Sequence, residues 1–265
     1  MQWLDYQPIE HARHWIATYS QFLVPYPPIE IREEIVDSLD AITDLIQSLE
    51  REIEARKKSY TGQSNILFDQ VKHKYPSLRL DEVATIYSGD TPRAKEKSYW
   101  GGPISWITPK DVSDGKMFIE QGERSITQEG FDSCSAKMLP EGSVLMTSRA
   151  PVENVAIAKR KLCTNQGMKS LVLNEDQDSH YWYHSLVHAK QRIQDASTTG
   201  TFSEISKEVF SRIKFHVPPL GVQQEIGASL GSLSTYIEGL EEELSLRKKQ
   251  YAYALDRLFD FHRFD

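Results

Sequence analysis

The 265-residue sequence has few cysteines and no long apolar segment. Its two cysteines, Cys134 and Cys163, are too few and too far apart for a zinc site or a disulfide framework. One disulfide between them remains possible, but a reducing, cytoplasmic setting is the default expectation. No apolar run approaches the ~20 residues that a bilayer span needs, and the start of the chain lacks a secretion signal. We therefore expect a cytoplasmic protein with no membrane partner.

The sequence also lacks an excess of positive charge. Its formal net charge is −7, which at first argues against a nucleic-acid partner. The charge is unevenly distributed, because residues 77–217 hold 18 Lys+Arg and 18 Asp+Glu. The acidity therefore lies in the flanking segments. A neutral middle segment can still present one basic face, so the composition does not exclude DNA.

Motifs for several enzyme classes are missing or weak. No glycine-rich phosphate loop and no Asn/Asp-Pro-Pro-Tyr/Phe motif occurs, so neither ATP binding nor amino-methyl transfer is supported. His180, His184 and His188 share one helical face, but without a further ligand nearby we expect a partly exposed helix face, not a metal site. Asp114-Gly115-Lys116 offers the acidic-x-Lys pair of a metal-dependent nuclease, yet Asp-Gly is also ordinary turn chemistry. We predict no metal and no cofactor.

What the sequence does contain is an internal repeat. PPIEIREEIVDSL at residues 27–39 returns without a gap as PPLGVQQEIGASL at residues 218–230. The match continues through the Arg-Lys-Lys triplets at 56–58 and 247–249. Such a match indicates a duplication, and a duplicated segment constrains the whole fold.

Both copies carry the a/d spacing of a heptad seam, with alternating steps of four and three residues. The seam positions, which we expect at a coiled-coil or partner interface, include Ile35, Leu39, Ile46, Leu49, Ile226, Leu230, Ile237 and Leu240. Pro28 and Pro219 suit the first turn of a helix. We predict spacer helices over 27–70 and 218–260 that pair as a long antiparallel coiled coil. Two amphipathic helices in an ordinary helical domain are the alternative.

The middle segment, residues 77–217, shows a different pattern. Short β-rich runs alternate with turn signals, namely VATIYSGDTP, ISWITPKDV, GSVLMTS, VAIAKR and KSLVL. One helical stretch, SHYWYHSLVHAKQRIQDAS, stands out. We expect one mixed α/β domain here, so the fold class of the chain is α+β. Trp100 and Trp106 flank a turn and are expected to pack there.

The order of these motifs resembles one known family. LDEVATIYSGDTPRAKEKSYWGGPISWITPKDV resembles the start of a target recognition domain from the specificity subunit of type I restriction-modification systems, and GSVLMTSRAPVENVAI, TNQGMKSL and TGTFSEISKEVFSRIKFHVPP match later family stretches. The two heptad copies resemble the family's spacer helices. A full subunit has two recognition domains, whereas this sequence has one. Residues 1–26 look like the end of a missing first domain, so the resemblance implies a half-subunit-like form.

The resemblance implies DNA contact by basic and amide side chains in the loops of the middle domain. Arg and Lys pair with guanine or phosphate, and Asn and Gln pair with adenine. The candidates are Arg93, Lys95, Lys97, Lys110, Arg149, Lys159, Arg160, Asn165, Gln166, Lys169 and Thr199.

On this reading the chain is a non-catalytic, sequence-specific DNA recognition subunit. It would read one half of a bipartite site in double-stranded DNA, and its coiled coil would set the half-site spacing. The family implies methyltransferase subunits and a restriction subunit as partners, and one recognition domain per chain suggests a homodimer. The alternatives are a metal-dependent nuclease and a coiled-coil adaptor that binds protein.

Overall fold

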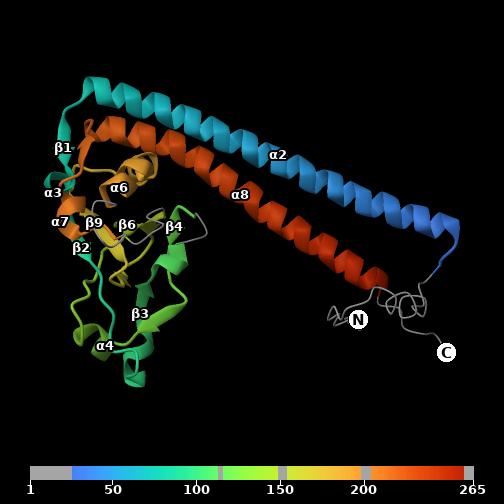
Figure 1. Ribbon diagram of the computed structural model, residues 1–265, viewed down its shortest axis with the longest axis horizontal. Coiled ribbons are helices and arrows are strands. Elements are labelled where there is room, and N and C mark those ends of the chain that lie inside the picture. The colour runs from blue at the N-terminus through green and yellow to red at the C-terminus, as the bar shows by residue number, and fades with distance from the viewer. Residues whose placement is uncertain (1–25, 113–115, 149–153, 198–203, 260–265) are drawn as a thin grey trace, which may run out of the picture. The chain divides into compact units, whose positions relative to one another are not determined.

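Two long helices occupy the two ends of the chain in the computed structural model, which describes residues 26–112, 116–148, 154–197 and 204–259 (Figure 1). Helix α2 spans Ile29–Lys74 and helix α8 spans Leu220–Phe259. Each begins directly after a Pro-Pro pair, as the repeat predicts. Helix α2 continues four residues beyond the predicted end, because the next residue that disfavours helix is Pro76. None of the helices within the described ranges combines the length and apolar character of a membrane span.

The chain forms two compact units, and α2 and α8 contribute to both. The first unit contains residues 1–55 and 239–265. Within it, Lys248 Nζ lies 2.7 Å from Glu50 Oε1, and the seam residues Leu49 and Ile53 are buried. The two helix segments of this unit therefore lie side by side at Glu50 and Lys248.

The second unit, residues 56–238, holds the other halves of the two helices and the whole middle domain. Gln63 Nε2 donates to Ser229 Oγ at 2.8 Å, and the Arg56 guanidinium lies 5.4 Å from the centre of the Tyr236 ring. Residue numbers rise along one helix as they fall along the other, so the pair is antiparallel. The predicted α+β class, with one mixed domain and an antiparallel helix pair, is confirmed.

The described part of the middle domain contains three sheets. The largest has the order β2-β9-β6-β7-β4, antiparallel except for the β4–β7 pair, and the others have the orders β5-β3-β8 and β1-β10. The strands are β1 Ser77–Arg79, β2 Ala84–Ser88, β3 Trp100–Ile107, β4 Phe118–Ile119, β5 Arg124–Ile126, β6 Val144–Thr147, β7 Val155–Ala158, β8 Cys163–Thr164, β9 Met168–Leu173 and β10 Lys214–His216. The five β-rich runs predicted from sequence correspond to β2, β3, β6, β7 and β9.

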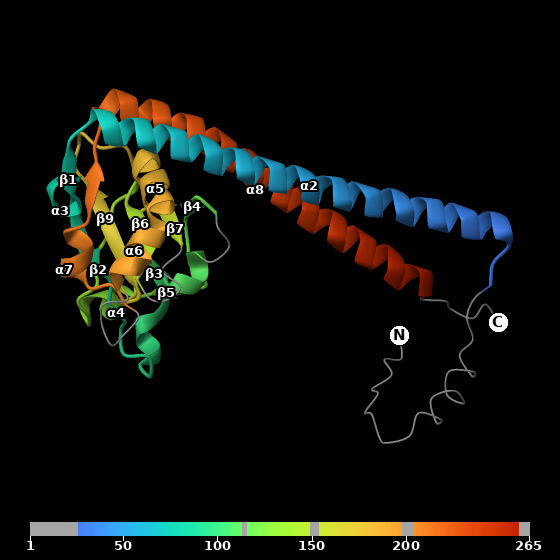
Figure 2. The same ribbon diagram turned by 45° about the horizontal axis from the view of Figure 1, so that its top comes forward.

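Short helices complete the domain. They are α3 Leu80–Val83, α4 Gln128–Asp132, α5 Ser179–His188, α6 Lys190–Ser197 and α7 Lys207–Ser211, with 3-10 turns η1 Lys97–Tyr99 and η2 Pro109–Val112. The stretch expected to form one helix is thus two, because the backbone of Ala189 leaves the helical region at ψ 3°. Figure 2 shows α5 and α6 beside the large sheet, beneath the helix pair.

Alternation along the strands divides the core into two layers. On β6, Val144 and Met146 face the cluster that includes Trp182 of α5 and Leu230 of α8, whereas Leu145 faces the opposite cluster. This period of two is what a sheet covered on both faces requires. The layer that contains Val144 and Met146 packs the domain against α8. The layer that contains Leu145 packs beneath the loops around β3.

Candidate nucleic-acid interface

The turn that follows β2 is fixed by the turn between β8 and β9. The backbone N–H of Asp90 donates to Thr164 O at 3.0 Å, and the Thr91 hydroxyl donates to the Gln166 side chain. A Cβ on Gly89 would lie 2.1 Å from Thr164 O, so only glycine permits this approach. Gln166 is therefore held beside the start of the loop that carries Arg93.

Asp90 anchors the same loop from its other side. Its carboxylate accepts hydrogen bonds from the backbone N–H of Ser135 at 2.9 Å and from the Ser135 hydroxyl at 2.7 Å. The Ser135 backbone bond lowers the pKa of Asp90, although partial burial opposes the shift. The indole N–H of Trp106 donates to Asp90 O at 3.0 Å. The base of the loop is rigid, while its basic side chains remain exposed, namely Arg93, Lys95 and Lys97.

A second carboxylate organises the loop after β3. Asp111 accepts from the Thr108 backbone N–H at 2.7 Å and from the Glu123 backbone N–H at 2.7 Å. Lys110 Nζ lies 2.6 Å from Glu123 Oε2, and the Glu123 carboxylate raises the pKa of Lys110. Both side chains of this pair are exposed, so the ion pair is weak. Lys110 can therefore exchange Glu123 for another anion.

Arg124 is a functional candidate that the sequence analysis missed. Its guanidinium lies 3.4 Å from the centre of the Trp100 ring and 5.7 Å from that of Trp106. The two indoles meet edge to face at 5.1 Å, and Trp106 is directly opposite Arg124 in the β3–β5 pair. Stacking fixes the guanidinium plane and leaves its N–H edge available. Arg124 is exposed and has no carboxylate partner among the described residues.

These contacts connect four loops around β3. Asn165 bonds through its backbone N–H to Ile107 O at 2.9 Å, and Gly167 packs against Pro109, next to Lys110. The structure thus brings together six of the predicted residues from distant parts of the sequence, with Arg124 beside them and Asp90 as the anchor of the first loop. The six are Arg93, Lys95, Lys97, Lys110, Asn165 and Gln166. The result is one surface of exposed cations, with the exposed amide of Gln166 and the half-buried amide of Asn165.

The remaining predicted residues lie elsewhere. Lys159 and Arg160 are exposed just beyond β7, where Lys159 Nζ is 3.6 Å from Glu120 Oε1. Lys169 is only 4% exposed, and its Nζ lies 3.2 Å from Ser148 Oγ and 3.5 Å from Glu204 Oε1. Burial and pairing favour a structural role for Lys169, because a buried cation must be compensated internally. Arg149 and Thr199 lie outside the described residues.

The histidine face of α5 is partly exposed, as expected, because His188 is exposed and His180 is half-buried. His184 is fully buried, and its Nδ1 lies 2.8 Å from the Tyr60 hydroxyl of α2. His188 Nδ1 lies 3.4 Å from Ser64 Oγ, and His180 packs near Gly231. This face docks the domain onto the helix pair. Within the described ranges no cluster of three His, Cys, Asp or Glu side chains could hold a metal, and Asp114 and Gly115 lie outside those ranges.

Comparison with known proteins gives a consistent result. The profile of the family described as "Type I restriction modification DNA specificity domain" matches residues 72–246. The chain is 33% identical over 283 residues to the EcoR124I/EcoR124II specificity subunit of Escherichia coli, which covers 98% of this chain and 69% of the relative. It is 34% identical over 175 residues to the MjaIX specificity subunit of Methanocaldococcus jannaschii, which covers 64% of this chain and 40% of that relative.

Solved structures share the fold. The S subunit from Mycoplasma genitalium superposes with a TM-score of 0.65 at 14% identity, over 88% of this chain and 62% of its own. The HsdS subunit from Thermoanaerobacter tengcongensis gives a TM-score of 0.52 at 19% identity, over 89% of this chain and 60% of its own. The chain thus spans about three fifths of these solved subunits.

Proposed function

Because this chain belongs to the DNA specificity family of type I restriction-modification systems, we propose that its middle domain reads one half of a bipartite site in double-stranded DNA. Specificity subunits recognise DNA and are not catalytic, so the chain is a recognition subunit and not an enzyme. The observation that supports the proposed interface is the surface around β3, where exposed cations and amides stand on rigid contacts.

The side chains on this surface suit different tasks. Arg124, stacked on Trp100, presents a fixed fork of donors that matches the O6 and N7 acceptors of guanine. The amides of Asn165 and Gln166 suit adenine. Arg93 and Lys95 extend from an exposed loop, which favours phosphate contacts that position the domain without reading sequence. Further cations proposed for phosphate contact are Lys97, Lys110, Lys159 and Arg160; Arg149 and Thr199 keep their proposed contact role on sequence grounds alone.

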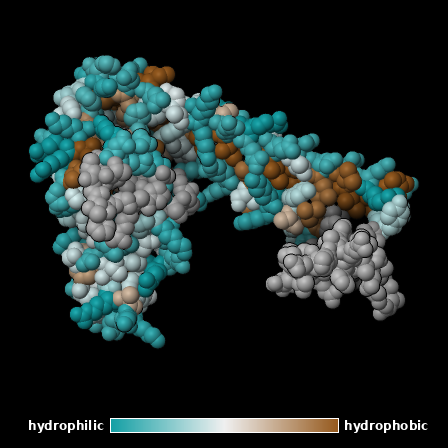
Figure 3. All heavy atoms as spheres, in the orientation of Figure 1, coloured by the Kyte–Doolittle hydropathy of each residue, from teal (hydrophilic) through white to brown (hydrophobic). Residues whose placement is uncertain are grey.

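We also propose that two copies of the chain assemble through their helices. Large apolar side chains are exposed on the helix segments of the first unit, and an exposed apolar patch often marks an interface. They are Ile29, Ile31, Val36, Leu45, Leu246 and Tyr253. Figure 3 shows apolar side chains gathered on these helix segments. A two-fold dimer would present two identical domains and read an inverted repeat whose gap the spacer helices set.

We propose the methyltransferase and restriction subunits of the system as protein partners, as the family implies. One solved neighbour is described in terms of complex assembly of the type I R-M system. We place the protein in the cytoplasm, where its DNA target lies. The free thiols of Cys134 and Cys163 suit that reducing compartment.

The test compares Arg124→Gln and Arg124→Lys with the wild-type chain on a cognate duplex. Loss of a bidentate guanine contact should weaken binding by about 1–3 kcal/mol, or roughly 5- to 150-fold. Arg124→Lys keeps the charge but loses the planar fork, so it should retain nonspecific affinity and lose discrimination at one base pair.

Arg212→Gln is the matched control, because Arg212 is an exposed cation at the end of α7, away from the four loops. It should leave both affinity and base preference unchanged. Equal affinity and equal base preference in wild type and both Arg124 variants would remove Arg124 from the interface.

A further inference from the structure

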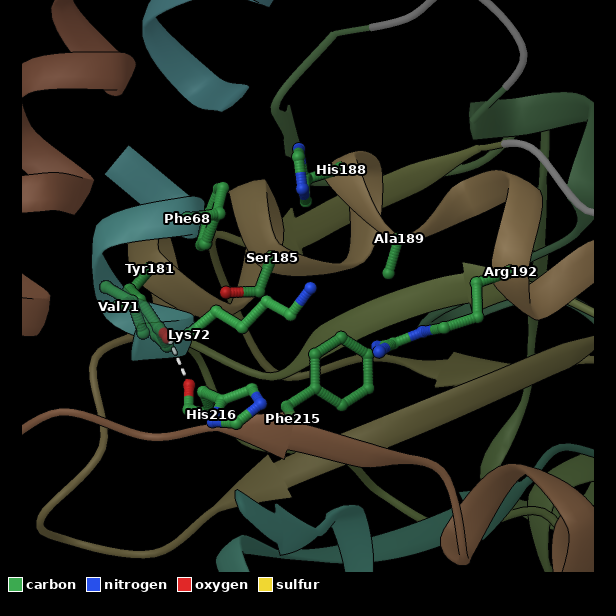
Figure 4. Close-up of a pocket in the computed structure, with 10 residues that line it drawn as sticks. All are labelled: Phe68, Val71, Lys72, Tyr181, Ser185, His188, Ala189, Arg192, Phe215 and His216. Atoms are coloured by element: carbon green, nitrogen blue, oxygen red, sulfur yellow. Dashed lines mark hydrogen bonds between the residues drawn. The ribbon is translucent and has the colours of Figure 1, made fainter. Parts of the chain in front are cut away.

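A cavity of about 280 Å³ lies between α2 and the middle domain, apart from the surface around β3. Its walls come from α2, α5, α6 and β10, all of which belong to the second unit. Three aromatic rings line it, namely Phe68, Tyr181 and Phe215 (Figure 4). A cavity of this size and lining suits one small ligand that carries an aromatic ring and a polar group.

Two cations reach into this cavity from opposite sides. Arg192 approaches the Phe215 ring, with its guanidinium 4.7 Å from the ring centre, and Figure 4 shows the Lys72 side chain running toward the same ring from α2. Burial lowers the pKa of Arg192, so its charge is partly desolvated. None of the described residues that line the cavity carries a carboxylate. Asp69, which lines the neighbouring groove, is 3.4 Å from His73.

The polar groups in the cavity wall complete the site. Ser185 is 2% exposed, and its Oγ makes no hydrogen bond of standard geometry within the described residues, although it lies near the Tyr181 phenol. His188 stacks on Phe68 at 4.7 Å, and burial together with the Arg192 charge lowers the pKa of His188. His216 donates from Nδ1 to Tyr75 O at 2.8 Å, so it is held in place. Two converging positive charges favour an anionic ligand, and the Ser185 hydroxyl can donate a hydrogen bond to it.

We propose that this cavity binds a phosphomonoester that also carries an aromatic ring, with a nucleoside monophosphate as the example tested. A phosphomonoester carries about −1.5 to −2 charges at pH 7, which matches the two cations Lys72 and Arg192. Arginine pairs with phosphate through two parallel hydrogen bonds. The ring would stack between Phe68 and Phe215, and the Ser185 hydroxyl would donate to the ligand. The bound nucleotide would bridge the spacer helix and the recognition domain.

The test is calorimetric titration of the full chain with AMP, with adenosine and with inorganic phosphate. AMP should bind, and adenosine and phosphate should each bind at least about tenfold more weakly, because each supplies only half of the contacts. Arg192→Gln and Lys72→Gln should each weaken AMP binding by about tenfold or more. Circular dichroism should show that both variants keep the wild-type fold.

Lys214→Gln is the matched control, since Lys214 neighbours Phe215 on β10 but does not line the cavity. This variant should bind AMP as the wild-type chain does. No AMP binding at millimolar concentration, or equal AMP affinity in the Arg192, Lys72 and Lys214 variants, would overturn the proposal. Neither result would affect the DNA interface, whose test uses other residues.

The same ligand chemistry occurs in a free nucleotide and in the 5′-phosphorylated end of a DNA strand. Competition between AMP and a duplex with 5′-phosphorylated ends separates these sources, with the unphosphorylated duplex as the reference. Displacement of AMP only by the phosphorylated duplex would assign the cavity to a DNA terminus. Retention of AMP against both duplexes would assign it to a free nucleotide.

Discussion

The contact between His184 and Tyr60 makes the stability of the second unit depend on pH. The Tyr60 hydroxyl is hydrogen-bonded to His184 Nδ1 at 2.8 Å, and His184 Nε2 has no hydrogen-bond partner within the described residues. Burial, assisted by the neighbouring His180, lowers the pKa of His184 to about 3. Protonation would therefore place an uncompensated charge in the core.

The sign and size of the effect follow from linkage. The folded chain binds fewer protons at His184 than the unfolded chain, whose pKa is about 6.5, so stability falls as the pH drops below 6.5. pH 5.0 lies about 1.5 pH units below the unfolded pKa. The free energy of unfolding at pH 5.0 is therefore about 2 kcal/mol lower than at pH 7.5. The loss continues until the pH reaches the folded pKa of about 3.

Urea unfolding at pH 7.5 and pH 5.0 measures this loss, and His184→Gln is the informative variant. Glutamine does not titrate and can still bond to Tyr60, whereas His188 and the carboxylates remain in both proteins and cancel in the comparison. The wild-type chain should lose about 2 kcal/mol more than the variant between the two pH values. Equal losses in both proteins would refute the assignment of His184 as a buried neutral group.

Two further predictions concern the helices. Leu49→Asp places a charge in the buried seam and should lower the free energy of unfolding by about 3 kcal/mol or more. Circular dichroism should show a loss of helix, and light scattering should show a loss of assembled mass. Ser48→Asp, on the exposed side of the helix, should be tolerated. Unchanged mass and helicity for Leu49→Asp would contradict the seam. Gly227→Ala should lower the melting temperature, because a Cβ at this position would lie 2.8 Å from Asp178 Oδ1. Gly239 has open space around it, so Gly239→Ala should stabilise α8 by up to about 1 kcal/mol. A higher melting temperature for Gly227→Ala would contradict the close packing of α8 on α5.

The long helices could be predicted because their signals are local. A heptad seam repeats every seven residues, and the prolines at 28 and 219 mark the starts of the helices. The domain inserted between the two copies favours an antiparallel pair. The strands β2, β3, β6, β7 and β9 were also predictable from short β-rich runs. The end of α2 was predicted four residues too early, although Pro76 marks it, and the break between α5 and α6 has no comparable local signal.

The recognition surface was harder to predict because it depends on strand pairing. Arg124 stacks on Trp100 only because β5 pairs with β3, and that pairing cannot be read from either segment alone. Lys169 is indistinguishable in sequence from an exposed cation, yet β9 lies in the centre of the large sheet and buries it. The buried His184 likewise depends on how α5 meets α2.

The central claim is that the surface around β3 reads half of a bipartite DNA site. Selection of bound duplexes from a random-sequence pool, with and without methyltransferase partners, tests it most directly. The account predicts enrichment of a gapped inverted repeat, with loss of preference at one guanine in each half for Arg124→Lys and a steep fall of affinity with salt. No enriched motif under either condition, or the same motif from wild type and Arg124→Lys, would contradict it.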